Sequence, residues 1–241
     1  MNIPHAHWAK YYDKVYDYSY NELYTSLTQT TINVIKNTIV APAKIVDFGA
    51  GTGRLSVPLS SAGYDIVAVE PCKEMIDQLI AKAQRKGLKI DTECQRMQDS
   101  QADGQYDMAL CVFTVLPYIL DYDSLTESVH AVERALRPGG LLLIDVPSRQ
   151  LFQSYEIINE QISRHMFFEA KSNNIYQYQE TTEMPNDGQP VRYTDSFKIR
   201  YWEPRIIQKL FASDGFYLVQ NLSQKFASFG SRYIIMGKGI T

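Results

Sequence analysis

The eight residues from Asp47 to Arg54, DFGAGTGR, decide how this chain folds. They follow AKIV, a short β-branched run that is typical of the end of a buried strand. Three glycines within five positions, followed by a leucine-containing helical pattern, indicate a tight turn from strand to helix where the backbone approaches a ligand. Asp47 is unexpected here, because loops of this kind usually receive phosphate and a carboxylate repels phosphate.

Strand and helix patterns alternate from Lys44 to Pro147 around this loop. Near-continuous apolar strands separated by helices are typical of a parallel sheet covered on both faces. Residues 216–222 and 232–239 add two strands, which we expect at the edge of the sheet. The pattern therefore predicts an α/β fold with a doubly wound, mostly parallel, Rossmann-like sheet of seven strands and helices on both faces.

The region 151–202 interrupts this alternation. Residues 155–170 have a helical pattern, whereas residues 174–183 and 191–202 alternate at period two around the turn signal at residues 185–188, PNDG. The region is therefore predicted to add an inserted antiparallel hairpin, preceded by a helix, to the α/β fold.

The composition excludes several classes of protein. The chain has 241 residues, of which 45% are hydrophobic and 21% charged, and its net charge is -3, so no nucleic-acid partner is expected. No apolar run approaches the ~20 residues of a membrane span, and the first 17 residues lack the apolar core of a signal peptide. The three scattered cysteines indicate neither a disulfide framework nor a zinc site, so a cytoplasmic protein is expected.

The loop chemistry favours one ligand over two common alternatives. A dinucleotide-binding loop has a small residue where this chain has Arg54, and a phosphate-binding loop needs a Gly-Lys-Ser/Thr sequence that is absent. Asp47 would repel a pyrophosphate but would attract an ammonium or a sulfonium group. S-adenosylmethionine carries both of these cations and no phosphate.

At this point VDFGAGTGR resembles the first motif of the class I S-adenosylmethionine-dependent methyltransferases. Four further landmarks of that family follow in order: VAVEP, MQD, YDMALCVFTV and RALRPGGLLLIDVP. The resemblance covers roughly residues 44–147 and implies S-adenosylmethionine as the cofactor. It implies that Glu70 accepts both ribose hydroxyls, that Asp99 holds the adenine amine and that Arg54 is a candidate clamp for the methionine carboxylate. The predicted cofactor-binding residues are Asp47, Gly49, Ala50, Gly51, Gly53, Arg54, Glu70, Pro71, Gln98, Asp99, Cys111 and Val112.

The loop after the fourth strand, CVFTVLPY, bears on the methyl acceptor. Family members that methylate nucleic acids or protein amides carry an Asn or Asp followed by Pro-Pro and an aromatic residue there, and this chain does not. Asp121 and Asp145 have no evident third partner for a magnesium site, so no metal is predicted. Methyl transfer mainly requires alignment of donor and acceptor, and a base is needed only when the acceptor must lose a proton.

Aromatic residues gather in two segments outside the core, 11–24 and 176–201. The first resembles the N-terminal helix that closes over the cofactor in small-molecule N- and O-methyltransferases, and we expect the insert to cover the acceptor pocket from the other side. The candidate catalytic residues are His7, Tyr12, Tyr16 and His165. The predicted substrate-binding residues are Tyr16, Phe113, Tyr118, Tyr193 and Tyr201.

These observations predict a methyltransferase acting at nitrogen or oxygen of a small molecule, with oligomerisation through the insert as an open possibility. Alternatives are a methyltransferase acting on a protein or RNA group, a non-catalytic S-adenosylmethionine-binding partner, and a nicotinamide-dependent oxidoreductase, which Asp47 and Arg54 disfavour. The expected organisation is one domain: a helical lid (1–40), a cofactor-binding core (41–150), an inserted substrate cap (151–202) and a C-terminal helix with edge strands (203–241).

Overall fold

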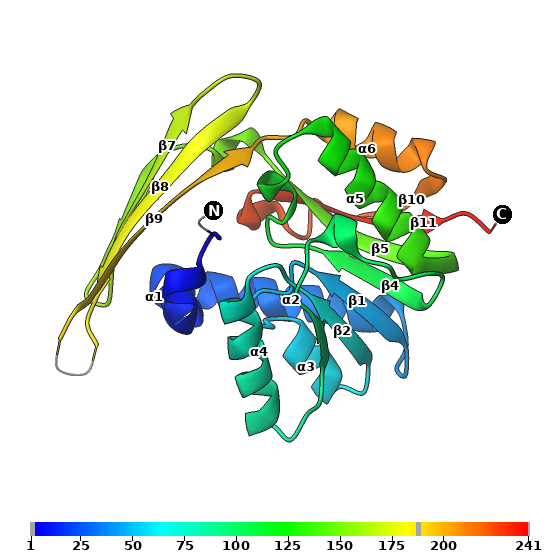
Figure 1. Ribbon diagram of the computed structural model, residues 1–241, viewed down its shortest axis with the longest axis horizontal. Helices are drawn as coiled ribbons and strands as arrows, with labels where there is room; N and C mark the ends of the chain where they lie inside the picture. The colour runs from blue at the N-terminus through cyan, green and yellow to red at the C-terminus, as the bar shows by residue number, and fades with distance from the viewer. Residues whose placement is uncertain (1–2, 187–188, 241) are drawn as a thin grey trace.

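The computed structural model describes residues 3–186 and 189–240, so the predicted turn at 185–188 lies partly outside the described residues. Its core is a seven-stranded sheet in the order β10-β11-β5-β4-β1-β2-β3 (Figure 1). The first five strands in chain order are parallel, and β11 and β10 are antiparallel additions at one edge, as predicted. The strands are β1 (Lys44–Phe48), β2 (Asp65–Val69), β3 (Asp91–Glu93), β4 (Tyr106–Cys111), β5 (Leu136–Pro147), β10 (Phe216–Asn221) and β11 (Ser231–Lys238).

Helices cover both faces of this sheet, which confirms the doubly wound prediction. Alternate residues of β1 enter opposite cores: Val46 and Phe48 belong to a cluster with α5 and α6, whereas Ile45 belongs to a cluster with α2, α3 and α4. The inner strands, such as β1 and β4, are therefore buried on both sides, which is why their sequences are mostly apolar. The helices of these layers are α2 (Glu22–Thr38), α3 (Ser56–Ser61), α4 (Lys73–Arg85), α5 (Tyr122–Ala135) and α6 (Pro204–Ser213).

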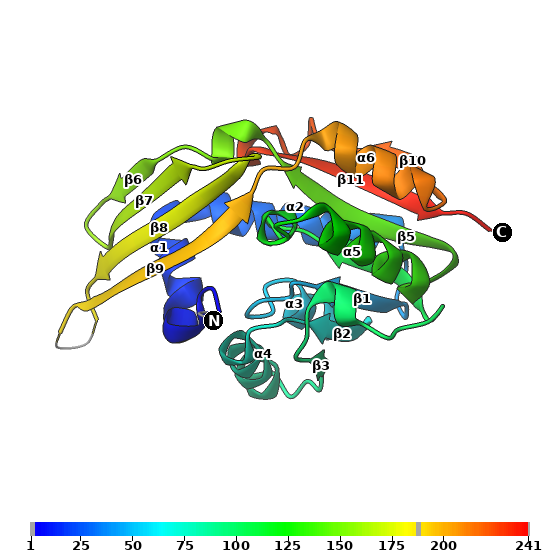
Figure 2. The ribbon, with the colours of Figure 1, turned by 45° about the horizontal axis from the view of Figure 1, so that its top comes forward.

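The N-terminal segment lies between the core and the insert (Figure 2). It comprises the 3-10 helix η1 (Ala6–Tyr11) and helix α1 (Tyr12–Tyr20), which lead into α2. Ala9 of η1 packs against Cys72 and Met75 at the start of α4, and Trp8 packs against the insert. The segment thus bridges the two sheets of the molecule.

The insert is a four-stranded antiparallel sheet in the order β6-β7-β8-β9, which extends the predicted hairpin by two strands. The helix expected over residues 155–170 is wrong, because β6 (Tyr155–Ile158) and β7 (Ser163–Ala170) occupy that stretch. Ile158, Ile162 and Met166 recur every four residues and so imitate a helical face, but Asn159 ends the first strand by accepting hydrogen bonds from the backbone N–H groups of residues 161 and 162. The predicted hairpin itself is β8 (Ile175–Met184) paired with β9 (Val191–Arg200).

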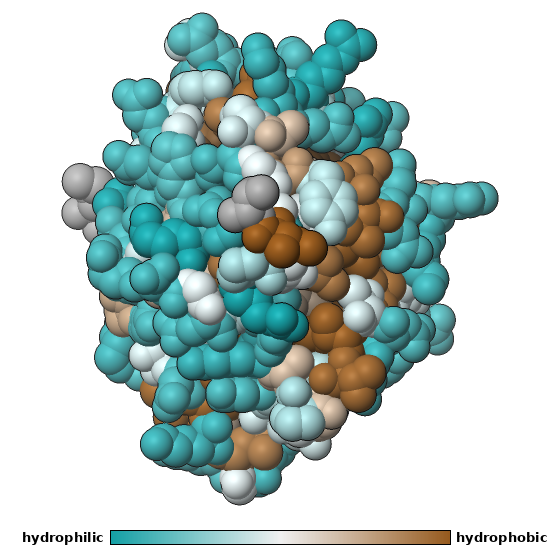
Figure 3. Space-filling model, turned by 90° about the vertical axis from the view of Figure 1, so that its right-hand side faces the viewer, coloured by the Kyte–Doolittle hydropathy of each residue, from teal (hydrophilic) through white to brown (hydrophobic). Residues whose placement is uncertain are grey.

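The end of the molecule away from the insert carries a band of apolar side chains among polar ones (Figure 3). On the edge strand β10, Tyr217, Leu218 and Val219 each expose about half of their surface. In the described part of the chain no helix combines the length and apolar character that a bilayer crossing requires.

Candidate active site

The three glycines of the DFGAGTGR loop have different roles. All have positive φ, of 72°, 55° and 81° for Gly49, Gly51 and Gly53. A Cβ at Gly49 would lie 2.5 Å from a methyl group of Val115, and one at Gly53 would lie 2.7 Å from Leu79. A Cβ at Gly51 would meet no atom within 4 Å, so the backbone at Gly51 is open to an approaching ligand.

Glu70 lies directly beside this open position. Its Oε2 accepts a hydrogen bond from the N–H of Gly51 at 3.0 Å, and its Oε1 accepts one from the N–H of Cys72 at 2.9 Å. Burial raises the pKa of Glu70, against the lowering effect of the two N–H groups. The carboxylate is therefore held at the C-terminal end of β2, facing the glycine loop.

Asp47, at the end of β1, is buried and accepts a hydrogen bond from the hydroxyl of Ser56 at 2.6 Å. Burial raises its pKa to about 6, although the Ser56 hydroxyl and the Arg54 charge act in the opposite direction. A cation bound at the loop would favour the ionised form of this carboxyl group.

Arg54 connects three segments around the loop. One of its Nη atoms donates to the hydroxyl of Thr28 on α2 at 3.1 Å, and its guanidinium lies 4.5 Å from the ring centroid of Phe113. This places a positive charge between the lid helices and the segment that follows β4.

The segment after β4 has a strained backbone at two residues. Phe113 and Thr114 have φ of 71° and 65°, a region that side chains other than glycine rarely adopt. The buried Asp145 stabilises the turn, because its Oδ1 accepts the N–H of Thr114 at 3.1 Å. Its Oδ2 makes no hydrogen bond within the described part of the chain, and burial raises its pKa to about 6.

The remaining predicted cofactor residues also follow strand ends. Cys111 is the last residue of β4; it and Val112 are buried, and burial raises the pKa of the Cys111 thiol.

Asp99 is exposed in η2 (Met97–Asp99), and both of its carboxylate oxygens accept hydrogen bonds from Arg96, at 2.8 and 2.9 Å. This ion pair lowers the pKa of Asp99 and occupies the carboxylate that was expected to hold adenine. Other predicted residues beside these strand ends are Ala50, Pro71 and Gln98.

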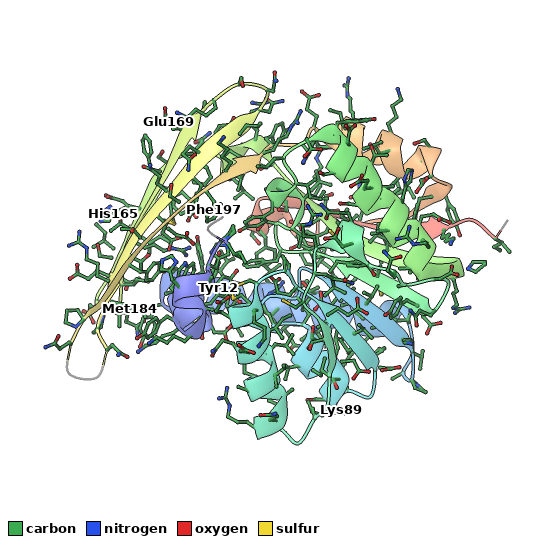
Figure 4. The ribbon with its side chains drawn as sticks, in the orientation of Figure 1. Tyr12, Lys89, His165, Glu169, Met184 and Phe197 are labelled. Carbon is green, nitrogen blue, oxygen red and sulfur yellow. The ribbon has the colours of Figure 1, made fainter. Side chains whose placement is uncertain are left out.

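A cavity of about 520 Å³ lies between the lid, the segment after β4 and the insert. Phe197 of β9 and Tyr12 of α1 face the space between the two sheets (Figure 4). Aromatic rings dominate the cavity wall, among them Tyr16, Tyr20, Tyr24, Phe113, Tyr118, Phe152, Tyr155, Tyr178 and Phe197. Apart from the tyrosines, its charged or titratable side chains are His5, Asp145 and Arg164.

Three of the five predicted substrate-binding residues line this cavity: Tyr16, Phe113 and Tyr118. Tyr193 and Tyr201 lie outside the wall. Tyr193 stacks on Trp8 with ring centroids 4.6 Å apart, and Tyr201 packs edge-on against Phe152.

The candidate catalytic residues are dispersed. His7 is exposed, and His165 is exposed on the outer face of the insert, where it pairs with Glu156 at 3.2 Å (Figure 4). Tyr12 packs between Trp8 and Tyr16, and burial raises its pKa. Of these candidates only Tyr16 lines the cavity.

The sequence did not predict that His5, Asp145 and Arg164 would line the cavity. Asp145 was considered there only as a possible metal ligand. Arg164 is buried and forms a bidentate ion pair with Glu180 at 2.9 and 3.0 Å, which keeps the pKa of Glu180 at about 2. A signal for this pair was available, because a charged residue at an inward position of a strand needs a partner on the neighbouring strand. The signal was hidden by the helical interpretation of residues 155–170.

The lid is attached to the cofactor loop by Asp13 of α1. Its Oδ1 accepts the hydroxyl of Thr52 at 2.6 Å, and its Oδ2 accepts Nζ of Lys82 at 2.7 Å. Burial lowers the pKa of Lys82 against the opposite effect of Asp13. Among the described residues, no three His, Cys, Asp or Glu side chains are grouped as a metal site would require.

A glycine loop at the switch point of a doubly wound sheet, with carboxylates at the ends of β1 and β2, defines a nucleoside-binding α/β enzyme class. Comparison with known proteins narrows this class. Residues 45–140 match the family model described as a methyltransferase domain. The ubiquinone biosynthesis O-methyltransferase of Rickettsia typhi is 24% identical over 110 residues, which cover 46% of this chain and 43% of that protein. The match spans about half the length of the curated relatives.

Two solved structures share the fold over nearly the whole chain. An S-adenosylmethionine-dependent methyltransferase from Clostridium acetobutylicum ATCC 824 has a TM-score of 0.82 at 18% identity, covering 95% of this chain and 98% of its own. CalS10, an amino pentose methyltransferase from Micromonospora echinaspora solved with bound S-adenosylmethionine, has a TM-score of 0.73 at 14% identity, covering 94% and 96%.

Residues 45–140 thus match a methyltransferase domain, which agrees with the resemblance to class I S-adenosylmethionine-dependent methyltransferases that the sequence indicated. The match to this methyltransferase domain supports S-adenosylmethionine as the predicted cofactor.

Proposed function

We propose that this protein transfers the methyl group of S-adenosylmethionine to a nitrogen or an oxygen of a small molecule held in the aromatic cavity. The observation that carries the proposal is the position of the cavity, which is walled by the lid, by the insert and by the segment after β4. In a doubly wound sheet, ligands bind outside the carboxyl ends of the strands, and this is where the cavity lies.

The size and lining of the cavity favour a small acceptor. A volume of about 520 Å³ is within the usual range for small-molecule sites, and aromatic rings form much of the wall. Both kinds of acceptor atom are named among the similar proteins, which include an O-methyltransferase and a sugar N-methyltransferase. Asp145 is a buried carboxyl group at the cavity wall, and its Oδ2 would accept an N–H or O–H of the acceptor.

The cofactor positions follow from the same geometry. Glu70 would hold the ribose hydroxyls beside the open backbone of Gly51. Asp47 and Arg54 would flank the methionine portion, with Asp47 attracting its ammonium group and Arg54 its carboxylate. The protein does not need to supply a cation for the reaction, because the sulfonium group of S-adenosylmethionine already activates the methyl carbon.

The test is methyl transfer from S-adenosylmethionine with a labelled methyl group to a panel of small amines and alcohols, compared with peptides and RNA. We expect label in small molecules only. Leu23→Trp fills the cavity that Leu23 lines, so it should abolish transfer while cofactor binding persists. Leu218→Trp is the matched control, because Leu218 is a similarly exposed leucine on the distant strand β10. Label in peptide or RNA alone would contradict the proposal.

A further inference from the structure

His5 is held in one orientation at the wall of the cavity. Its ring meets four aromatic rings edge-on, with centroid distances of 5.1 Å to Trp8, 5.6 Å to Tyr12, 5.8 Å to Tyr118 and 5.1 Å to Phe197. The side chain leaves 13% of its surface exposed. Such packing excludes water from the ring and restricts its rotation, so the two ring nitrogens point at defined neighbours.

Each ring nitrogen of His5 faces a different polar group. Nε2 lies 2.7 Å from the hydroxyl of Tyr118, at the end of η3 (Leu116–Tyr118). Nδ1 lies 3.5 Å from Oδ2 of Asp195 on β9. Nδ1 makes no hydrogen bond among the described residues, so this carboxylate is a charged neighbour of the ring rather than its hydrogen-bond partner. A carboxylate, an imidazole and a phenol thus lie next to one another, although they come from the insert, the N-terminal segment and the segment after β4.

Asp195 is itself fixed by several donors. Its buried Oδ2 accepts the backbone N–H of His5 at 2.8 Å and Nε1 of Trp8 at 2.9 Å, and its Oδ1 accepts the N–H of Ser196 at 2.9 Å. These contacts keep the carboxylate pointing at the imidazole. A carboxylate beside Nδ1 favours the tautomer with its proton on Nδ1, which leaves the Nε2 lone pair to accept the Tyr118 hydroxyl.

The protonation states at neutral pH leave the imidazole of His5 uncharged and able to accept a proton. Burial lowers the pKa of His5 to about 4, with further lowering by Arg164 and His7, and this outweighs the raising effects of Asp195 and Glu180. The pKa of Tyr118 is raised as well, because neighbouring protein atoms desolvate part of the side chain and Tyr16, Glu70 and Asp195 lie near it. At pH 7 the imidazole is thus neutral and the phenol is protonated. Tyr118 leaves 41% of its surface open and lines the cavity, so its oxygen is accessible to an acceptor.

We propose that Tyr118, His5 and Asp195 form a proton relay that removes the proton from the methyl acceptor. This inference rests on the proposed methyl transfer. The lone pair of the acceptor nitrogen or oxygen forms the bond to the methyl carbon, and the electron pair of the broken C–S bond goes to sulfur. The acceptor N–H or O–H proton passes to the Tyr118 oxygen, whose own proton passes to Nε2 of His5.

The charge balances across this step. The sulfonium cation becomes a neutral thioether, and the positive charge appears on the His5 imidazolium beside the Asp195 carboxylate. The imidazolium then returns its proton to water when the product leaves, because the buried ring is acidic. Tyr118 is the catalytic residue of the relay, whereas His5 and Asp195 act through it as positioning residues.

The first test needs no acceptor. Nitrogen NMR of ¹⁵N-labelled protein should show His5 neutral at pH 7, with its proton on Nδ1 and a titration well below that of an ordinary histidine. Tyr118→Phe should shift the Nε2 resonance of His5, whereas Tyr122→Phe, a matched change at an exposed tyrosine, should not. A charged His5 at pH 7, or a proton on Nε2, would overturn the relay while leaving methyl transfer unaffected.

The second test uses turnover with an acceptor identified by the labelled-methyl assay. Tyr118→Phe should lower kcat by roughly 10²–10⁴-fold with the KM for S-adenosylmethionine nearly unchanged. Its rate should then rise with pH above 7, because hydroxide replaces the lost proton acceptor. His5→Ala should be restored in part by added imidazole, whereas His130→Ala, at an exposed histidine of α5, should need no rescue.

The relay would be contradicted if Tyr118→Phe kept the wild-type rate and pH profile. It would also be contradicted if His5→Ala bound the cofactor but gained no activity from added imidazole. If the wild-type protein binds S-adenosylmethionine but methylates no small molecule, the proposed function fails first, and the relay fails with it. The NMR result and the transfer assay therefore separate the two failures.

Discussion

At the scale of single residues, two glycines at positive φ allow the effect of backbone strain to be measured apart from the effect of ligand contact. Gly51 and Gly87 both have positive φ, of 55° and 67°, and both would place a Cβ in open space. Gly51 lies beside Glu70, whereas Gly87 follows the C-terminal end of α4. The pair therefore distinguishes a glycine needed for its conformation from one that is also needed for close approach.

We predict that Gly51→Ala and Gly87→Ala each cost about 1–2 kcal/mol of unfolding free energy, because an alanine is strained at positive φ. Only Gly51→Ala should abolish binding of S-adenosylmethionine, since its methyl group would occupy cofactor space. Chemical denaturation and titration calorimetry measure the two effects. Equal cofactor affinity in both variants would show that the cofactor does not approach Gly51.

Asp47 gives the site a pH dependence whose sign can be derived. Its pKa of about 6 means that the carboxyl group is neutral below pH 6 and ionised above it. Because the ionised form attracts the cations of S-adenosylmethionine, affinity should fall by at most about tenfold between pH 7 and pH 5. Because folding raises the pKa of Asp47, its protonated form contributes to the free energy of unfolding. This contribution is fully present below about pH 4 and is lost as the pH rises through about 6.

The measurement is calorimetric titration of S-adenosylmethionine at several pH values. Asp47→Asn should remove most of the pH dependence and weaken binding at pH 7, whereas Asp65→Asn, at the exposed start of β2, should change neither. Asp145 also titrates near pH 6, so the dependence that remains in Asp47→Asn reports its contribution. A wild-type affinity that stays constant from pH 5 to pH 7 would contradict the role given to Asp47.

At the scale of elements, the lid and the insert are joined by contacts between residues far apart in sequence. Asp195 of β9 accepts hydrogen bonds from His5 and Trp8, and Trp8 stacks on Tyr193 of the same strand. Asp13 connects the other side of the lid to Thr52 and Lys82. The cavity therefore depends on the lid being attached to both the core and the insert.

We predict that Asp13→Asn increases the dissociation rate of S-adenosylmethionine by on the order of tenfold, because a charge-assisted contact worth about 1 kcal/mol holds the lid on the loop. Hydrogen exchange over η1 and α1 should quicken in the same variant. Asp123→Asn, in the exposed first turn of α5, serves as the control. An unchanged dissociation rate would indicate that the lid closes without this contact.

At the scale of the whole molecule, binding of the cofactor should stabilise the chain as a unit. A ligand present at about 100 times its Kd adds about 2.7 kcal/mol to the unfolding free energy, which raises Tm by on the order of 5–10 °C for a chain of this length. Thermal denaturation should show this increase with S-adenosylmethionine and with its demethylated product. NAD should give none, because Asp47 and Arg54 disfavour a pyrophosphate at the loop. An increase with NAD alone would contradict the cofactor assignment.

The sequence alternates apolar strands with helices and carries five motifs in order. These features were sufficient to predict the sheet, the helices that cover it and the resemblance to the methyltransferases. These features are local: a buried strand requires apolar residues on both faces, and a strand-to-helix turn at positive φ requires glycine. Asp47, Gly51 and Glu70 could be placed together for the same reason, since parallel strands end at one edge of the sheet.

Only the tertiary structure decided the composition of the acceptor cavity. Residues 155–170 were expected to be helical, because Ile158, Ile162 and Met166 fit a helical period as well as they fit two strands with a turn. Pairing of β7 with β8, which buries Arg164 against Glu180, resolved that ambiguity. His5 gave no sequence signal at all, because its partners Tyr118 and Asp195 lie 113 and 190 residues away along the chain. A local pattern specifies what a segment buries, whereas the partner of a buried polar group depends on how distant segments pack.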